Sequence, residues 1–317
     1  MSGILKPHTL SASKTVEFSQ GSRQMNRIFS YLFWAIFSFP VYAVEGVDVV
    51  KVKENIHVLV SPAGGNVVVS TGEDGTFLID DQLPGRSELI LSAVKEIDPQ
   101  EIKFVLNTHY HFDHVSGNEL LGEQDAVIVA HDNVRQRLKT RQFISYFQKE
   151  VLPLKKVGLP TVTMSDQMTL HYNDDEIQLF HTPAAHTDGD VVAIFTKANV
   201  IVGGDLIFNG RYPFLDVEHG GSIQGLIKGL DKLLAIADDK TVVIPGHGGI
   251  MTKGDLQHFR DMLNTISNNV EMAINEGKTL AEVIAAKPSI NFDEEFGKSI
   301  IPPDDMVTAI YQSLKQE

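Results

Sequence analysis

The stretch at residues 106–114 constrains this chain of 317 residues more than any other part of it. Four residues that can bind metal ions lie within six positions there: His109, His111, Asp113 and His114. The apolar run before them, 103–106, predicts a buried strand, so the four side chains are expected on a loop that a sheet holds in place. Because side chains two residues apart on an extended segment point the same way, the first three are expected to share one side, with His114 elsewhere. This arrangement suits two adjacent metal ions.

Composition narrows the chemistry further. The formal net charge is -14 and the sequence pI is near 5.3, which argues against nucleic acid as the main partner, since that needs a broad basic surface. The chain has no Cys, so any metal must be held by His and carboxylate side chains. With 43% hydrophobic residues the chain can build a large core, as one large domain or two smaller ones.

The N-terminal part has the pattern of an export signal. A basic start at 25–27 leads into an apolar run at 28–39, and small residues follow up to Ala43. This predicts a signal peptide at about residues 25–43, cleaved after Ala43, and a periplasmic or secreted protein without a stable membrane anchor. The apolar run is too short for an ordinary membrane span. An uncleaved anchor remains the alternative, and Met25 could be the true start.

The remaining chain predicts strands first and then strands alternating with helices, which suits a mixed α/β layering. The strands are expected at 47–52, 55–60, 66–70, 76–80, 103–106, 127–130, 161–164, 168–172, 176–181, 191–196, 199–202 and 241–244. The helices are expected at 86–97, 115–121, 132–148 and 222–237, with a mostly helical tail from 253 to 317.

The expected helix at 132–148 is the one basic stretch of an acidic chain. Its charged and aromatic residues are Arg135, Arg137, Lys139, Arg141, Lys149, Phe143, Tyr146 and Phe147. One interpretation is an amphipathic helix with a solvated face. The other is a lid over the site that offers aromatic surface and positive charge to an anionic small-molecule substrate.

Three further candidates lie on loops that follow predicted strands: His186, Asp205 and His247. One-sided loops carrying such residues are how sheets with helices build active sites. A ligand set of His and Asp without thiolates favours catalytic ions with an open coordination position. Two ions could share a hydroxide, which would act as the nucleophile in place of a Ser or Cys side chain. A bridging carboxylate would hold the two ions together.

The run Thr-His-Tyr-His-Phe-Asp-His at 108–114, with His186, Gly-Asp205 and Gly-His247, resembles the metallo-β-lactamase superfamily over residues 48–250. The resemblance implies an α+β fold, a four-layer αββα sandwich with a helical C-terminal tail, and a dinuclear site. The implied first-metal ligands are His109, His111 and His186. The implied second-metal ligands are Asp113, His114 and His247, with Asp205 bridging the metals. Asp80 matches the first motif of the superfamily, whose Asp supports the site without binding metal, although a simple turn cap is the alternative.

This resemblance divides the chain into three parts: an N-terminal extension and signal peptide (1–43), a catalytic domain (44–250) and a C-terminal helical segment packed on that domain (251–317). Asp205 matches glyoxalase II-like and lactonase-like members, whereas many true β-lactamases carry Cys or Ser there. Lactonase-like members usually carry Tyr three residues later, where this chain has Phe208. The other surroundings of the motifs resemble β-lactamases.

The predicted function is therefore a secreted dinuclear zinc hydrolase. A metal-bridging hydroxide would cleave an ester, thioester, lactone or lactam bond, with Asp113 and Asp205 as catalytic carboxylates. The alternatives are a β-lactamase proper, an iron-dependent oxidoreductase similar to persulfide dioxygenases, and a non-catalytic protein that kept its metals. Iron or manganese could replace the two zinc ions, since His and carboxylate suit them as well. No sequence feature points to an oligomeric state.

Overall fold

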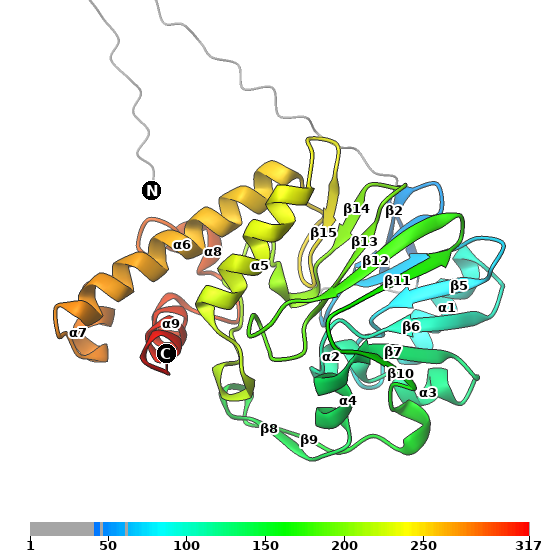
Figure 1. The fold of residues 1–317 in the computed structure, drawn as a ribbon, viewed down its shortest axis with the longest axis horizontal. Coiled ribbons are helices and arrows are strands. Elements are labelled where there is room, and N and C mark those ends of the chain that lie inside the picture. The colour runs from blue at the N-terminus through cyan, green and yellow to red at the C-terminus, as the bar shows by residue number, and fades with distance from the viewer. Residues whose placement is uncertain (1–40, 45–46, 61–62, 317) are drawn as a thin grey trace, which may run out of the picture. The chain divides into compact units, whose positions relative to one another are not determined.

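The computed structural model describes residues 41–44, 47–60 and 63–316 (Figure 1). The chain divides into two units after Ser38, and every described residue belongs to the second. The predicted leader lies outside these residues apart from its last three, which are part of strand β1 (Val41–Val44). Among the helices of the described ranges, none combines the length and the apolar character that crossing a bilayer requires.

The first sheet has eight strands and contains the strand that leads to the 106–114 stretch. In spatial order they are β1, β2 (Val47–Lys53), β3 (Ile56–Val60), β4 (Val67–Ser70), β5 (Thr76–Ile79), β6 (Ile102–Leu106), β7 (Val127–His131) and β10 (Val162–Met164). The strands from β1 to β5 pair antiparallel, and β5, β6, β7 and β10 run parallel. The parallel part places the ends of β5, β6 and β7 at one edge.

The second sheet has five strands. They are β11 (Gln167–Tyr172), β12 (Asp175–His181), β13 (Val191–Phe195), β14 (Val200–Val202) and β15 (Val242–Ile244), in that order. Only the last pair, β14 and β15, runs parallel. The strands predicted from the sequence match the observed ones to within a residue or two.

The two sheets face each other across a shared apolar core, and helices cover their outer faces. In β4, Val68 points into the core between the sheets, while Val67 and Val69 point to the helix side. Because both faces of such a strand are buried, it reads as a continuous apolar run and not as an alternating one. The four layers confirm the αββα sandwich expected from the sequence.

The helices of the two outer layers come from different halves of the chain (Figure 1). Helices α1 (Ser87–Ile97) and α3 (Asn118–Gly122) cover the first sheet. The second sheet is covered by α5 (Ile223–Ile236) and α6 (Lys253–Asn275), and α7 (Leu280–Ala285), α8 (Asp293–Phe296) and α9 (Pro303–Gln316) join the same apolar core. The helical tail is therefore confirmed and packs on the second sheet. Helix α6 begins with a capping box in which Thr252 and Asp255 satisfy each other's backbone N–H groups.

The prediction of one helix over 132–148 is wrong in its second half. Helix α4 covers only Asp132–Leu138, and a hairpin of β8 (Gln142–Ile144) and β9 (Lys149–Val151) follows, with the 3-10 turn Ser145–Phe147 at its tip. The Gln142 side chain donates a hydrogen bond to the Arg137 carbonyl at 3.1 Å. This hydrogen bond satisfies one of the carbonyl groups in the last turn of α4. The aromatic tip residues pack against Phe214, a contact that the local pattern does not contain.

The expected helix at 115–121 is interrupted. It is divided between α2 (Phe112–Val115) and α3, because the Gly117 backbone N–H donates to the Asp81 carboxylate at 2.6 Å. The short helix α2 starts inside the 106–114 stretch, and this changes the direction of two candidate ligands.

Candidate metal centre

The seven candidate ligands come from four loops that meet at one edge of the sandwich. His109 and His111 follow β6, and Asp113 and His114 belong to α2. His186 lies between β12 and β13, Asp205 follows β14, and His247 follows β15. The structure brings all seven together as two groups whose ligand atoms lie within 4.8 Å of one another.

The first group consists of His109, His111, His186 and Asp205, all buried. The Nδ1 atom of His111 lies 3.1 Å from His109 Nε2 and 2.9 Å from His186 Nε2. The Asp205 Oδ2 atom lies 3.9 Å from His109 Nε2 and 3.6 Å from His186 Nε2. Three ring nitrogens and one carboxylate oxygen therefore surround a common point.

The second group consists of Asp113, His114 and His247. The Nε2 atoms of the two histidines are 3.4 Å apart, and Asp113 Oδ2 lies 3.3 Å from that of His247. Asp205 reaches this group as well, with 3.2 Å from its Oδ1 to His114 Nε2 and 3.3 Å from its Oδ2 to His247 Nε2. Asp205 is thus the side chain that both groups share.

The expectation that Asp113 faces the same way as His109 and His111 is wrong. The two-residue alternation holds only while the chain is extended, and α2 begins at Phe112. Asp113 therefore turns toward His114 and His247, the grouping that the family resemblance implied.

Hydrogen bonds orient the rings of the first group. Thr108 Oγ1 donates to Asp80 Oδ2, so it can only accept from His109 Nδ1, at 3.0 Å. His186 Nδ1 donates to the Phe214 carbonyl at 2.8 Å. Each of these rings therefore turns an unprotonated Nε2 toward the centre. Such oxygen partners are what fixes the tautomer of metal-binding histidines.

His111 has the opposite orientation, because its Nε2 donates to Asp216 Oδ2 at 2.8 Å. The Asp216 carboxylate is buried and also accepts from Tyr110 Oη at 2.6 Å and from His219 Nδ1 at 2.7 Å. Its pKa is held below the usual value, because these hydrogen bonds outweigh the effect of burial. An ionised Asp216 fixes the His111 ring with Nδ1 toward the centre.

Asp80 has the corresponding role in the second group. Its Oδ2 accepts from His114 Nδ1 at 2.7 Å, and its Oδ1 accepts from the Thr108 backbone N–H at 2.7 Å. These contacts agree better with a supporting role than with a simple turn cap. Among the described residues, no carboxylate has this role for His247, whose ring stacks on Phe208 with ring centres 5.3 Å apart.

Two glycines allow backbone segments to approach the ligands. A Cβ atom on Gly246 would lie 2.0 Å from Asp205 Oδ1, and one on Gly65 would lie 2.3 Å from the His114 ring. Both positions therefore exclude any larger residue while the ligands keep their places.

The two groups differ in protonation. Burial lowers the pKa of His109 well below its usual value and that of His186 to about 4. Burial also opposes the charged form of His114 and His247, but the nearby carboxylates outweigh it: the pKa of His114 is raised well above its usual value and that of His247 to about 9. In the metal-free protein, His109 and His186 of the first group are therefore neutral, whereas His114 and His247 of the second group are cationic.

The donor set fits metal ions. In the part of the chain that is described, Asp205 Oδ1 is buried and makes no hydrogen bond, although His114 Nε2 lies 3.2 Å away. The three ring nitrogens of the first group carry no hydrogen on the side where they meet, so they cannot satisfy one another. A cation placed among them would satisfy all of these atoms.

A small pocket of about 80 Å³ opens onto these ligands. Its other walls are mostly aromatic and aliphatic, from Phe112, Ile144, Phe147, Phe208, Tyr212, Phe214, Ile300 and Ile301, with Arg211 and Ser299 as polar members. Arg211 has no hydrogen bond or ion pair with any described residue. This arginine, Asp216 and Phe214 were not singled out from the sequence, which has no local motif around them.

The basic stretch around α4 contributes apolar surface to this pocket and little charge. Phe147 lines the pocket, as the lid interpretation expected of an aromatic residue there, and Ile144 lines it as well. Arg137 is bound to both oxygens of Asp188, at 2.8 and 2.6 Å, and Arg141 pairs with Glu150. Arg137 therefore holds the loop that carries His186.

The fold and the site define a class, the metal-dependent hydrolases built as two facing sheets with a His/Asp site at one edge. The model of the metallo-beta-lactamase superfamily matches residues 58–247. The chain belongs to this superfamily.

Two curated relatives are similar over most of their own length. A probable metallo-hydrolase of Methanocaldococcus jannaschii is 28% identical over 200 residues, which are 61% of this chain and 86% of the relative. The hydroxyacylglutathione hydrolase GloC of Haemophilus influenzae is 26% identical over 184 residues, 58% of this chain and 85% of the relative. These relatives and the superfamily make the protein a metal-dependent hydrolase.

Solved structures show the same fold. The DIM-1 metallo-beta-lactamase superimposes with a TM-score of 0.56 at 22% identity, covering 70% of this chain and 99% of its own. The sec-alkylsulfatase Pisa1 of Pseudomonas sp. gives 0.63 at 16% identity, covering 83% of this chain and 49% of its own.

Proposed function

We propose that the protein is an exported dinuclear zinc hydrolase that cleaves an ester, thioester, lactone or lactam bond of a small molecule. The observation that carries this proposal is the position of Asp205, whose carboxylate lies between a group of three histidines and a group of Asp113, His114 and His247. Such a shared carboxylate suits a pair of ions held a few ångströms apart.

When bound, the ions lower the pKa of a coordinated water, which supplies the nucleophile, and polarise the carbonyl of the substrate. The chain itself contributes orientation. Asp216 and Asp80 hold His111 and His114 in place, and the Thr108 hydroxyl and the Phe214 carbonyl do the same for His109 and His186. Ring positions that are set before the ligand arrives need no rearrangement during the reaction.

The pocket supports an acyl group of modest size with an anionic substituent. The Phe147, Phe208 and Phe214 rings exclude water beside the ligands and suit an apolar chain. Arg211 lines this pocket and is not neutralised by any described residue, so a carboxylate on the substrate would find a partner there. We assign the anion-binding role to Arg211, whereas the sequence pattern had suggested the basic stretch after Asp132.

Export is proposed from the sequence pattern at residues 25–43. Fractionation of cells that produce the full chain should find the protein outside the cytoplasm, and N-terminal sequencing should read from Val44. A protein that starts at residue 1 or 25 and stays in the cytoplasm contradicts this part of the proposal.

Metal analysis combined with a substrate screen tests the central claim. The purified protein should contain two zinc ions per chain and hydrolyse at least one of a simple ester, a thioester, a lactone and nitrocefin. Turnover of nitrocefin would narrow the assignment to a β-lactamase with Asp205 in an unusual position. Iron content with oxygen consumption and no hydrolysis would replace the proposal with an oxidoreductase.

The role of Arg211 has a matched control within the basic stretch. Arg211→Gln should raise the KM for a succinyl ester about tenfold, because one charge-assisted hydrogen bond to the substrate is lost. The KM for a butyryl ester, which carries no charge, should stay unchanged. Arg141→Gln removes the same charge from a residue already paired with Glu150 and should change neither KM. Equal effects of the two variants on KM would mean that Arg211 does not bind the substrate.

A further inference from the structure

The pocket at the metal ligands is too small to hold a whole substrate. Its volume is about 80 Å³, whereas pockets that enclose small-molecule ligands usually measure roughly 300–1,000 Å³. The reacting bond and a short acyl chain fill it. The rest of the substrate must extend beyond Phe214 and Ile301.

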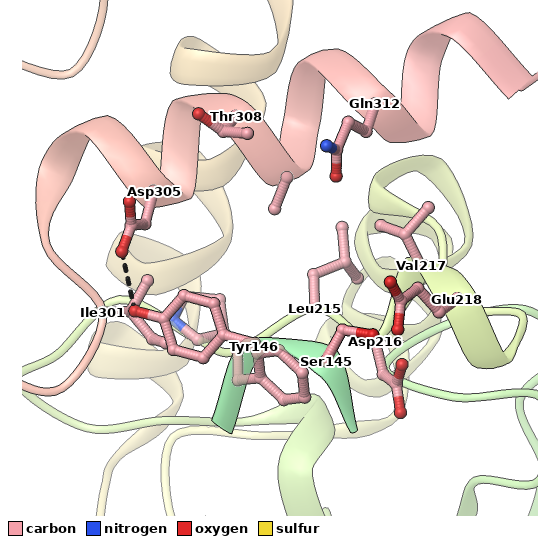
Figure 2. Close-up of a pocket in the computed structure, with 13 residues that line it drawn as sticks. Ser145, Tyr146, Leu215, Asp216, Val217, Glu218, Ile301, Asp305, Thr308 and Gln312 are labelled. Atoms are coloured by element: carbon pink, nitrogen blue, oxygen red, sulfur yellow. Dashed lines mark hydrogen bonds between the residues drawn. The ribbon is translucent and has the colours of Figure 1, made fainter. Parts of the chain in front are cut away.

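A second cavity of about 310 Å³ begins at these two residues, which line both spaces. Figure 2 shows its walls: the tip of the β8–β9 hairpin below, the loop at 213–218 on one side and helix α9 above. Successive residues of the hairpin tip face different spaces, since Ser145 and Tyr146 line the cavity while Ile144 and Phe147 line the metal pocket. The cavity thus adjoins the metal pocket.

The walls of the cavity combine aromatic rings with carboxylates. Asp305 and Glu218 lie toward opposite ends of the view in Figure 2. Asp305 accepts a hydrogen bond from Tyr146 Oη at 2.8 Å, and Glu218 makes no hydrogen bond or ion pair with any described residue. Within the described ranges, no Lys, Arg or His lines the cavity. Tyr146 and Phe214 add two rings whose centres are 5.5 Å apart.

Aromatic rings beside uncompensated carboxylates are the chemistry that binds ammonium groups, because the ring faces and the carboxylates both attract positive charge. An anion would be repelled by Glu218 and Asp305, and a neutral apolar group would leave both negative charges without a cationic partner.

We propose that this cavity binds a cationic ammonium group on the leaving-group part of the substrate, while the acyl part occupies the metal pocket. The inference rests on the proposed hydrolase function. It adds a subsite for positive charge next to the pocket that contains Arg211, so that the two parts of the substrate are selected by opposite charges.

Binding of a small cation and of its neutral isostere provides the first test. Choline and 3,3-dimethyl-1-butanol have nearly the same shape and differ in charge. Titration of each into the metal-loaded protein, followed by calorimetry or ligand-observed NMR, should give at least about fivefold tighter binding of choline. Equal dissociation constants would overturn the proposal.

Variants then locate the cation. Glu218→Gln with Asp305→Asn removes two charges from the cavity without changing side-chain size and should abolish the preference for choline. Glu271→Gln with Glu276→Gln removes the same charge from exposed positions, one on α6 and one directly after it, and should preserve the preference. A preference that persists in the cavity variant would show that the cation binds elsewhere, which also overturns the proposal.

Turnover separates this inference from the hydrolase assignment. For butyrylcholine the cavity variant should raise KM at least about threefold with kcat unchanged, and for 3,3-dimethylbutyl butyrate it should change neither. Equal KM values for both esters in both proteins would reject the cation subsite while the hydrolase stands. If neither ester is cleaved, ester hydrolysis fails, and the choline titration still decides the subsite.

Discussion

The two ligand groups are built from the same residue types but in different electrostatic surroundings. The first group has three buried histidines with oxygen partners behind them and a single carboxylate, Asp205, in front. The second has two histidines that face two carboxylates, and His247 and Asp113 are partly open to the pocket. Without metal, His109 and His186 of the first group are neutral, whereas His114 and His247 of the second group carry protons that a metal ion must displace.

This difference has a structural origin. His109 and His111 follow directly from β6, and the Asp216 loop is held by Tyr110 and His219. His247 stacks on Phe208 and has no buried carboxylate holding its ring from behind among the described residues, and Asp113 belongs to a helix of one turn. We therefore expect the first group to bind its ion more tightly than the second.

The largest effect is expected from the residue that the two groups share. Asp205→Ala should lower kcat at least about thousandfold and reduce the metal content of both groups, because neither ion keeps its common carboxylate. Metal analysis and turnover of the same preparation measure this. A variant that keeps one tightly bound ion would mean that the first group does not depend on Asp205.

Asp113→Ala should separate the groups. The variant loses the carboxylate that belongs to the second group alone, so its metal content should fall from two ions to one and hydrolysis should fall at least about a hundredfold. The remaining ion should bind with unchanged affinity. Near wild-type turnover in this variant contradicts the assignment of two functional ions.

The supporting carboxylates allow a more selective comparison. Asp216→Asn should weaken metal binding to the first group about 10- to 100-fold by releasing His111, and Asp80→Asn should do the same to the second group through His114. Titration of the metal-free variants with Co²⁺ would resolve the two affinities without any assay of activity. If each variant weakens both groups equally, the two carboxylates act on the fold as a whole.

The smallest effect concerns the stability of the metal-free protein as pH changes. The pKa of His247 is raised to about 9, so its contacts with Asp113 and Asp205 stabilise the folded state fully below pH ~6.5, the pKa of an unfolded His. This stabilisation is lost as pH rises through about 9. Urea unfolding of the wild type and of His247→Gln should differ by ~1–2 kcal/mol more at pH 6 than at pH 10. A difference that grows with pH would reverse the assigned charge of the second group.

Much of the fold was readable from the sequence because short apolar runs and turn residues mark the strands. Apart from β1, whose residues were mostly assigned to the leader, the strands of both sheets appear where these patterns placed them, and the helical tail follows from its periodic apolar residues. The hairpin at 142–151 could not be predicted from the local sequence, because its aromatic residues pack on Phe214, which is distant in the chain. Tertiary contacts there outweighed the local helical pattern.

The sequence by itself determined the candidate ligands and the family, because metal-binding side chains can be recognised by type and spacing after predicted strands. Only the tertiary structure decided how they divide into two groups, that Asp216 orients His111 across 105 positions of the chain, and that Arg211 and the acidic cavity flank the site. These features depend on side chains that meet only when the two sheets face each other. The residues adjacent in sequence do not indicate which distant side chains will be in contact, so no local pattern could have predicted these contacts.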